Sequence, residues 1–373
     1  MKNIIFVTEI KALSNKEATS THIMSYNLLK GFHDNNCNVS LIAIYSGEDD
    51  QIDEIKKSYS HVANNIICVK SKLGHNVNKY KQILKMLYLT YFSKGYKKVI
   101  SGNLNLEDSV LISHNPSIES IFICKYLKSK CVKYIQYWSD PIAISGIYPK
   151  NLNYKRVIHK VVENKCLSYA DLIIYGTKVL FDAQKEIYKK YQNKMDYINI
   201  SYTEKSNTQD ANKNNNFIYA GNYYSNIRNI KPLYQAFNEE EIGRLVVYGK
   251  SDLKLQSTKN VEIHERISPD QLKEIEKEYN NIVCITNINC LQIPGKIFYD
   301  MSDKKNILVI LDGEYKEEIK SYLDTYKRFI TCYNTEEDIK TAILSLKESQ
   351  FSSEYAIENF SPKQIVKTLL EKI

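Results

Sequence analysis

The feature that most constrains the fold is an alternation of short apolar runs with helix-length segments, which occurs twice along the chain. Alternation of this kind predicts a parallel sheet covered by helices. In the first pass, helix-length segments lie at 21–33, 79–92, 117–129 and 154–169, between apolar runs at 3–7, 39–44, 65–69, 99–100, 110–113, 133–137 and 172–175.

The pattern restarts after a polar, Asn-rich stretch, 203–216 (TEKSNTQDANKNNN), which has no period and is typical of an interdomain linker. The second pass therefore predicts another doubly wound domain of Rossmann type. Its apolar runs lie at 217–221, 245–249, 261–264, 282–287, 307–311 and 329–333, and its helical segments at 228–238, 269–280, 295–303, 314–327 and 335–347.

Length and composition agree with two folded α/β domains. At roughly 100–200 residues per domain, 373 residues favour two domains. A hydrophobic content of 43% with 25% charged residues excludes a disordered chain and a membrane bundle. Neither half contains G-x-G-x-x-G or G-x-x-x-x-G-K-[ST], which disfavours a dehydrogenase and a P-loop NTPase.

Charge is concentrated in the first half. Residues 1–200 carry 28 Lys and Arg against 17 Asp and Glu, whereas 201–373 carry 23 against 26. The basic half fits an anionic membrane surface or a phosphate-linked acceptor, and no zinc-finger, RNP-like or basic-zipper signature supports nucleic acid. There is no signal-peptide core, no spanning segment and no C-x-x-C pair among the eight cysteines, so we expect reduced thiols in the cytoplasm.

The most informative segment is 292–301 (QIPGKIFYDM). Pro294 and Gly295 stand before a helical run, where free backbone N–H groups and the helix dipole attract anions, and Lys296 adds a full charge. This spacing predicts a phosphate or diphosphate cradle. An ordinary loop with a surface lysine would have the same sequence pattern.

Residues 292–311 (QIPGKIFYDMSDKKNILVIL) resemble the donor-site helix and following strand of GT-B glycosyltransferases, particularly the retaining family 4 enzymes (glycosyltransferase group 1). Three further places are similar to this family in the same order. They are the helix and strand at 163–175 (ENKCLSYADLIIY), FIYAGN at 217–222 followed by 228–230 (RNI), and VVYG at 246–249.

The resemblance implies two Rossmann-like domains that face a central cleft, with an acceptor-side domain at 1–205, a nucleotide-sugar domain at 214–350 and a C-terminal helix at 351–373 that crosses back. It also implies that Arg228 grips the donor diphosphate together with Lys296, without a metal ion or cofactor. The donor-binding candidates are Gly221, Asn222, Arg228, Gly249, Arg266, Gln292, Pro294, Gly295, Lys296, Tyr299 and Asp300.

The sequence departs from the family at the two donor-site glutamates, which are absent. Gln292 and Asp300 have the family's spacing, whereas alignment on Pro-x-Lys places Tyr299 at the second position. Successive helix residues point about 100° apart, so only one of the two can face the cleft. A carboxylate accepts from two vicinal hydroxyls better than a phenol, which favours Asp300. A solvated helix residue remains the alternative.

Two catalytic candidates lie in the first half. Asp140 follows the run 133–137, at the strand end where such sheets bind ligands. It is suited to orient or deprotonate an acceptor hydroxyl or to contact the reacting sugar, although Asp-Pro is also a common turn opener. His114 ends another strand, and a lone histidine is more often structural. His22, in the loop EATSTH, is a further candidate beside the acceptor.

The resemblance implies transfer of a sugar from a nucleotide sugar to a saccharide or lipid-linked acceptor in bacterial surface-polysaccharide (capsule or O-antigen) assembly. The helix at 79–92 and the lysines up to 98 form a basic amphipathic surface, which favours contact with the inner face of the membrane over core packing alone. The absent glutamates keep open a catalytically silent GT-B subunit that binds a partner enzyme. A nucleotide-sugar epimerase, which shares the fold, is the other alternative.

Overall fold

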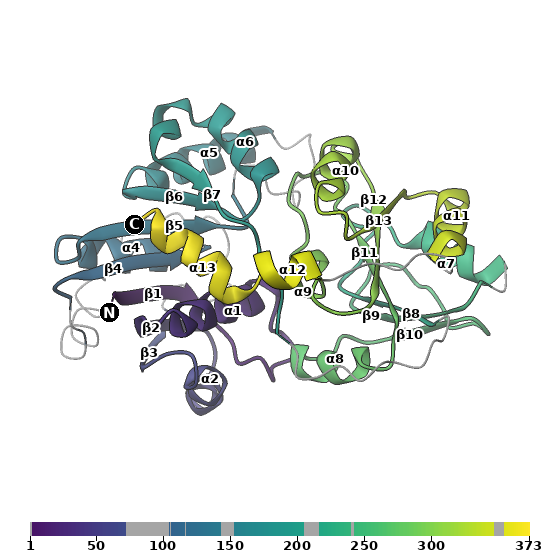
Figure 1. Ribbon diagram of the computed structural model, residues 1–373, viewed down its shortest axis with the longest axis horizontal. Coiled ribbons are helices and arrows are strands. Elements are labelled where there is room, and N and C mark those ends of the chain that lie inside the picture. Colours follow the sequence, from purple (N-terminus) through teal and green to yellow (C-terminus); the bar gives the residue numbers. More distant parts are fainter. Residues whose placement is uncertain are drawn as a thin grey trace. The chain divides into compact units, whose positions relative to one another are not determined.

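The structure is a computed structural model that describes residues 2–71, 104, 106–115, 117–142, 153–204, 216–239, 242–346 and 354–373. The chain divides into two compact units (Figure 1). The first contains 1–143, 157–199 and 362–373, and the second contains 144–156 and 200–361.

The first unit is built on a seven-stranded parallel sheet in the order β3-β2-β1-β4-β5-β6-β7. Its strands are β1 (Asn3–Glu9), β2 (Asn38–Tyr45), β3 (Asn65–Lys70), β4 (Ser109–His114), β5 (Lys133–Trp138), β6 (Leu172–Tyr175) and β7 (Met195–Tyr197). Its helices are α1 (Ser20–Asp34), α2 (Gln51–Tyr59), α4 (Ile118–Lys128), α5 (Asn153–Leu167), α6 (Lys178–Ile187) and α13 (Pro362–Glu371), with a 3-10 turn, η1 (Lys189–Lys194).

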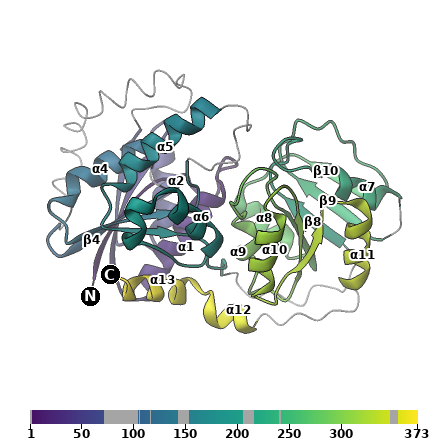
Figure 2. The ribbon, with the colours of Figure 1, turned by 90° about the horizontal axis from the view of Figure 1, so that it is seen from above.

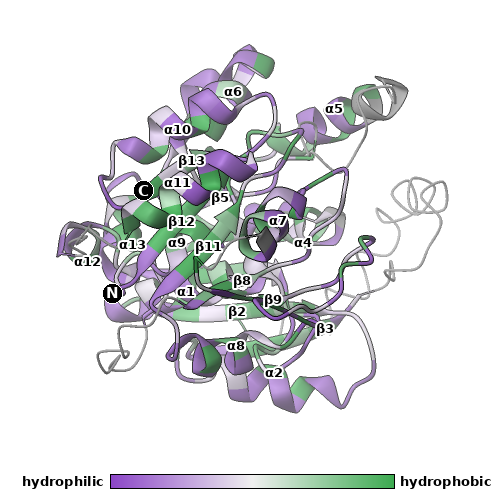
Figure 3. Ribbon diagram, turned by 90° about the vertical axis from the view of Figure 1, so that its right-hand side faces the viewer, coloured by the Kyte–Doolittle hydropathy of each residue, from purple (hydrophilic) through white to green (hydrophobic). Residues whose placement is uncertain are grey.

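The strands of the first sheet are nearly continuous apolar sequences. This is expected because helices cover both faces of a parallel sheet and bury both sides of each strand. In β4 every residue is buried, and in β5 all but the first. Figure 3 shows that in the second unit the strands β11 (Asn281–Ile285) and β12 (Asn306–Leu311) are mostly hydrophobic, whereas helix α8 (Pro269–Glu276) is mostly hydrophilic.

The C-terminal helix α13 packs against α1 within the first unit (Figure 2). The contact is close at Gly31, where a Cβ atom would lie 2.3 Å from the carbonyl oxygen of Pro362. Only a residue without a side chain fits there. Asn35 fixes the same junction by donating a hydrogen bond to the carbonyl of Lys363 (2.8 Å).

The second unit is built on a six-stranded parallel sheet in the order β10-β9-β8-β11-β12-β13. Its strands are β8 (Asn216–Ala220), β9 (Arg244–Tyr248), β10 (Val261–His264), β11 (Asn281–Ile285), β12 (Asn306–Leu311) and β13 (Ile330–Tyr333). Its helices are α7 (Lys231–Glu239), α8 (Pro269–Glu276), α9 (Lys296–Tyr299), α10 (Lys316–Asp324), α11 (Glu336–Leu346) and α12 (Glu354–Asn359).

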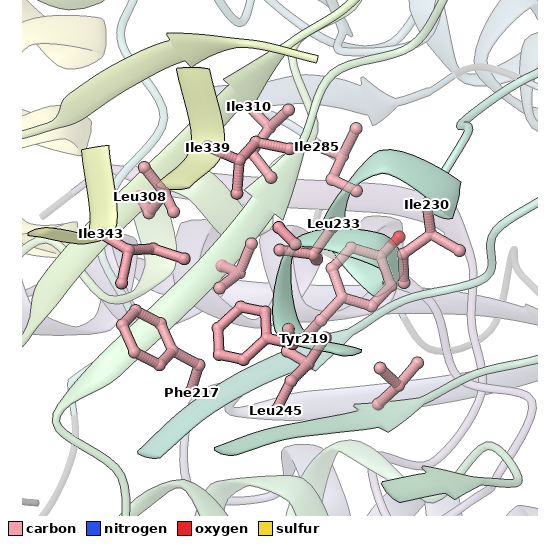
Figure 4. Close-up of a cluster of buried hydrophobic side chains, with 14 of the residues drawn as sticks. Phe217, Tyr219, Ile230, Leu233, Leu245, Ile285, Leu308, Ile310, Ile339 and Ile343 are labelled. Atoms are coloured by element: carbon pink, nitrogen blue, oxygen red, sulfur yellow. The ribbon is translucent and has the colours of Figure 1, made fainter. Parts of the chain in front are cut away.

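One face of the second sheet is closed by α7 and α11. Leu233 of α7 and Ile339 and Ile343 of α11 pack with side chains of β8, β9, β11 and β12 (Figure 4). Tyr219 of β8 is part of this cluster and is 2% exposed. The helices cover the face of the sheet but not the carboxyl ends of its strands. The loops that follow those ends carry polar residues.

The expectation of two parallel α/β sheets is confirmed. Two details differ from the sequence analysis. The expected helix at 295–303 is only the short α9, because the chain turns at 300–304. The C-terminal part of the first unit begins at Pro362, whereas α12 belongs to the second unit.

Candidate functional site

Each sheet reverses its strand order once, between β1 and β4 in the first unit and between β8 and β11 in the second. Open parallel sheets bind ligands outside the carboxyl ends of the strands, at such a reversal. The carboxyl ends of β1, β4 and β5 are called here the first edge. Those of β8, β9 and β11 are called the second edge.

A buried hydroxyl and imidazole group lies behind the first edge. The Ser25 hydroxyl of α1 lies 2.7 Å from Nδ1 of His114, and the Thr8 hydroxyl donates to the carbonyl of His114 (3.3 Å). His114 also packs against Tyr137, with the ring centres 5.2 Å apart. These contacts tie α1 to β1 and β4.

His114 was a catalytic candidate, but the structure encloses its side chain completely. Burial lowers the pKa of the imidazole to about 3, and the charge of nearby His22 acts in the same direction. The ring is therefore neutral at physiological pH. Since an acceptor cannot touch a ring with no exposed surface, His114 supports the first edge from behind in this arrangement.

Asp140 lies at the first edge itself, one residue beyond Ser139 and two beyond the end of β5. Its Oδ2 accepts hydrogen bonds from the Thr21 hydroxyl (3.3 Å) and from Nδ2 of Asn115 (3.2 Å). Its Oδ1 is buried and has no hydrogen-bond partner among the described residues, although Asp140 as a whole is partly exposed. One carboxylate oxygen is thus anchored, and the other still lacks a donor.

The electrostatics of Asp140 follow from this asymmetry. Burial raises the pKa of its carboxyl to about 6, and the hydrogen bonds from Thr21 and Ser139 oppose that rise. A carboxyl with a pKa near neutral can take up a proton and give it back at physiological pH. The first edge therefore contains a carboxyl group with a raised pKa, and its catalytic role stays a prediction.

His22 has a local structural function. Its Nδ1 accepts a hydrogen bond from the backbone N–H of Thr19 (2.7 Å), the residue that caps α1. This contact satisfies a backbone donor just before the helix. It places His22 at the start of α1, beside Thr21, which contacts Asp140.

The second edge brings together three of the expected donor-binding residues. The Arg228 guanidinium donates from Nη1 to the backbone carbonyl of Asn222 (3.2 Å) and from Nη2 to Oδ1 of Asn287 (2.7 Å). A Cβ atom on Gly221 would lie 3.4 Å from Nη1. Arg228 therefore spans the ends of β8 and β11, at the reversal of strand order.

The charge of Arg228 is not neutralised by a described carboxylate, since none lies within 4.0 Å of the guanidinium in the ranges given above. Its Nε is buried and has no hydrogen-bond partner in the same ranges. Burial raises the pKa of the neighbouring Tyr219 phenol, and the positive charge of Arg228 opposes that rise. The second edge thus contains a partly buried cation with no carboxylate partner among the described residues.

Gly249 has a packing function at this edge. A Cβ atom there would lie 2.1 Å from the carbonyl oxygen of Gly221, so the turns that follow β8 and β9 touch backbone to backbone. The Asn222 side chain fixes the same approach by accepting a hydrogen bond from the backbone N–H of Lys250 (3.1 Å). Gly249 and Asn222 position the turn that carries Gly221 beside Arg228.

Lys296, expected to face the donor, has its ammonium ion-paired with buried Glu276 of α8. The carboxylate of Asp300 lies 3.8 Å from the same ammonium. A lysine between two carboxylates brings no net positive charge to a ligand. In this structure Lys296 therefore joins α9 to α8, and the expectation that it adds charge to the diphosphate does not fit its contacts.

Tyr299 and Asp300, the two alternatives for the missing glutamate, are both buried. The Tyr299 carbonyl accepts from the backbone N–H of Thr203 (3.0 Å). Asp300 lies within the electrostatic reach of Arg328, whose guanidinium donates to three backbone carbonyls of the turn at 301–305. Both residues stabilise the α9 region, and the structure does not choose between them as ribose ligands.

The other candidates lie in connecting segments. Gln292 and Pro294 are partly exposed between β11 and α9, and Gly295 is buried at the start of α9. Arg266 is partly exposed between β10 and α8. The basic helix at 79–92, with the lysines up to 98, lies outside the described residues.

Sequence reasoning missed the three residues that organise these contacts, Asn115, Asn287 and Glu276. Both asparagines come directly after or near a strand end, beside residues that had been noticed, and this position was the available signal. Nothing in the sequence indicated the contact of Glu276, because helical periodicity does not show which carboxylate faces Lys296.

Two kinds of feature are absent from the described ranges. No group of three or more His, Cys, Asp and Glu side chains there is arranged to hold a metal ion. No helix within them is both long and apolar enough to cross a membrane.

Comparison with known proteins gives structural matches only. No protein-family model matches the sequence, and neither does any curated protein. Among solved structures, the glycotransferase of kitacinnamycin matches at a TM-score of 0.58 and 10% identity, covering 100% of this chain and 98% of that one. Anabaena HepE, in complex with UDP and glucose, matches at 0.63 and 10%, covering 100% and 99%.

A Listeria monocytogenes protein assigned as a UDP-N-acetylglucosamine 2-epimerase also matches, at a TM-score of 0.56 and 10% identity, covering 100% of this chain and 98% of that one. Identities this low show the fold alone. The fold is the GT-B fold, which these glycosyltransferases share with the epimerase.

Proposed function

We propose that this protein is a glycosyltransferase that moves a sugar from a nucleoside diphosphate sugar to a hydroxyl group of a saccharide or lipid-linked acceptor, in the assembly of a bacterial surface polysaccharide. The observation that carries the proposal is Arg228, a partly buried guanidinium at the strand-order reversal of the second sheet with no described carboxylate partner. A guanidinium in this setting suits bidentate contact with a diphosphate.

In the proposed reaction, the acceptor oxygen attacks the anomeric carbon of the donor sugar while the bond to the diphosphate oxygen breaks. Asp140 accepts the proton of the acceptor hydroxyl, and its pKa of about 6 leaves it mostly ionised at neutral pH. Arg228 stabilises the negative charge that develops on the leaving nucleoside diphosphate. Because Arg228 supplies this charge, the proposal includes no metal ion.

Two parts of the proposal rest on sequence alone. The relation to family 4 comes from the resemblance at 292–311, and anionic membrane contact follows from the basic segment 79–98. Both stay predictions. Retention of the anomeric configuration is not part of the proposal, because a direct displacement with Asp140 as the base inverts it.

A nucleotide titration tests the donor site. We expect UDP or GDP to bind the full chain and Arg228→Ala to weaken binding about 10–100-fold, which corresponds to the roughly 1.5–3 kcal/mol of a charged hydrogen bond. Arg244→Ala is the matched control, because Arg244 is exposed at the amino end of β9. Calorimetry of both variants measures the effect, and the control should bind as the wild type does.

The same proteins distinguish the glycosyltransferase from a silent subunit and from an epimerase. A catalytically silent subunit would bind neither nucleotide, and equal affinities of the Arg228→Ala and Arg244→Ala variants would remove the donor site from the second edge. Incubation with a panel of UDP- and GDP-sugars without acceptor would reveal an epimerase by the appearance of an isomeric donor.

A further inference from the structure

We propose that helices α4 and α5 of the first unit present a surface that binds an anionic lipid bilayer. This surface, called here the α5 surface, consists of Lys125 of α4 and of Val157, Lys160, Val161 and Lys165 of α5. It is separate from the basic segment 79–98. Lipid binding through it requires no sugar transfer, so its failure would leave the proposed donor site in place.

The outer face of α5 follows from the angular spacing of its residues. At about 100° per residue, Val157, Lys160, Val161 and Lys165 fall within an arc of about 140°. All four are exposed, the two valines by 61% and 64%. Glu163, the only acidic residue of α5, lies outside this arc and is completely buried. The helix therefore directs its acidic side chain inward, and its lysines and two valines outward.

Helix α4 extends the same surface. The ammonium groups of Lys125 and Lys165 lie over the ring of Tyr169, 5.0 and 5.5 Å from its centre, so lysines of the two helices meet at one place. Glu119 is the only acidic residue of α4, and it is 1% exposed. Among the described side chains of α4 and α5, the exposed charges are therefore all positive.

This distribution of charge sets α4 and α5 apart within the first unit. Each of the other described α-helices there has an acidic residue with exposed surface, namely Asp34 in α1, Asp53 in α2, Asp182 in α6 and Glu371 in α13. No described carboxylate lies within 4.0 Å of the ammonium groups of Lys125, Lys160 and Lys165. Three lysines without a carboxylate partner attract an anionic surface.

The two valines indicate which kind of anionic partner fits. Valine is a poorer helix former than alanine, glutamate or lysine, and its exposed apolar surface gains nothing in water. Nucleic acid phosphates would pair with the lysines but would leave Val157 and Val161 in water. A bilayer interface accepts apolar side chains beside anionic headgroups that pair with lysine. Valine and lysine on one helix face therefore favour lipid.

Vesicle co-sedimentation of the full chain tests the lysines. We expect binding to phosphatidylcholine vesicles that contain about 30% phosphatidylglycerol, and little binding to phosphatidylcholine alone. Lys160→Glu combined with Lys165→Glu should weaken binding at least about 25-fold, because each lysine near an anionic bilayer is worth about fivefold in affinity. The matched control is Lys56→Glu combined with Lys57→Glu, on α2, since both lysines are exposed and the change in net charge is the same. The control should change binding less than about threefold.

Val157→Ser combined with Val161→Ser tests the apolar part without a change in charge. This variant should weaken vesicle binding about fivefold. Leu344→Ser is the matched control, since Leu344 is 51% exposed on α11 of the second unit, and it should bind as the wild type does. Wild-type affinity of the valine variant would mean that the valines do not meet the lipid, and it would overturn the inference.

Tryptophan fluorescence locates the contact and covers the case in which the lysine variant does not fold. The single tryptophan of the chain, Trp138, is 1% exposed and cannot contact a bilayer. In Val161→Trp the emission should shift to shorter wavelength when the anionic vesicles are added, and in Leu344→Trp it should not. An unshifted emission of Val161→Trp, even in a protein that sediments with the vesicles, would place the contact elsewhere and contradict the inference.

A random-sequence duplex DNA is the comparison ligand. Binding to DNA without binding to vesicles, abolished by Lys160→Glu with Lys165→Glu, would assign the surface to nucleic acid and overturn the lipid inference. Binding to vesicles without binding to DNA supports it. The nucleotide titration of Arg228→Ala needs no vesicles, so the donor site and the α5 surface succeed or fail separately.

Discussion

At the scale of single residues, the first unit places two titratable side chains with opposite shifts at the carboxyl ends of neighbouring strands. Burial raises the pKa of Asp140 to about 6 and lowers that of His114 to about 3. Both shifts favour the neutral form, since an ion without compensation is costly inside a protein.

Asp140→Asn should therefore stabilise the protein at pH 7–8. The folded pKa of about 6 lies above the ordinary 3.8, so the native state binds the proton more tightly, and the wild type loses stability as pH rises from about 4 through 6. The gain has an upper limit of roughly 3 kcal/mol, at 1.36 kcal/mol per pKa unit. Denaturant unfolding of both proteins at pH 4 and pH 8 measures it.

The gain should nearly vanish at pH 4, where the wild-type carboxyl is protonated in the folded state. A difference of the same size at both pH values would show that the substitution acts through packing and that Asp140 does not titrate with a raised pKa.

At the scale of elements, the second edge depends on the close approach of the turns after β8 and β9. Gly249 is required there because any side chain would meet the Gly221 carbonyl. Gly221 has ordinary van der Waals space at its own Cβ position, beside the Arg228 guanidinium. We therefore expect Gly249 to be needed for folding and Gly221 to be needed for ligand binding beside Arg228.

Gly249→Ala should lower the free energy of unfolding by about 1–3 kcal/mol, as overpacking does. Gly221→Ala should leave the melting temperature nearly unchanged but weaken UDP binding about tenfold, because its methyl group occupies space next to Arg228. Thermal melts and UDP titrations of the two variants test this division. The reverse pattern would mean that Gly221, and not Gly249, is held by packing.

Elements were predicted well from the sequence where apolar periodicity decides them, and poorly where a distant partner does. The run at 110–113 became part of the buried strand β4, whose centre is the apolar sequence Val110–Ile112. By contrast, α9 ends after four residues because Arg328, 27 positions beyond Met301, binds the backbone of the following turn. No local pattern contains that contact.

The same distinction applies to the candidate site. Asp140 was singled out because it follows a strand of an α/β pattern, and Arg228 because it matches a position in the family that the sequence resembles; the roles of both stay predictions. Asn115 contacts residues 24 and 25 positions away, and Lys296 meets Glu276 across 20 positions, so their roles depend on how the loops fold together. The lysine charge seen in the sequence is real, but the buried glutamate that compensates it could not be predicted.

At the scale of the whole molecule, the stability of the first unit depends on a helix from the far end of the chain. Gly31→Val should displace α13, because even a Cβ atom there would meet the Pro362 carbonyl. We expect the thermal transition of the first unit to fall, with UDP affinity of the second unit within about threefold of wild type. Calorimetry with and without UDP resolves both effects.

Lys367→Ala is the control for this substitution, since Lys367 is exposed on the same helix. If Gly31→Val and Lys367→Ala melted alike, α13 would contribute little to the first unit, and the contact at Gly31 would not be needed for its stability.

The position of α13 also determines what a single break in the chain would do. A cut between 205 and 215 yields an amino-terminal fragment with most of the first unit and a carboxyl-terminal fragment that carries most of the second unit together with α13. We expect the two fragments to remain joined without a peptide bond, through the packing of α13 on α1 and the ion pair between Lys372 and Asp196. The C-terminal helix α13 would therefore hold the two fragments together. They should separate only when α13 dissociates from α1.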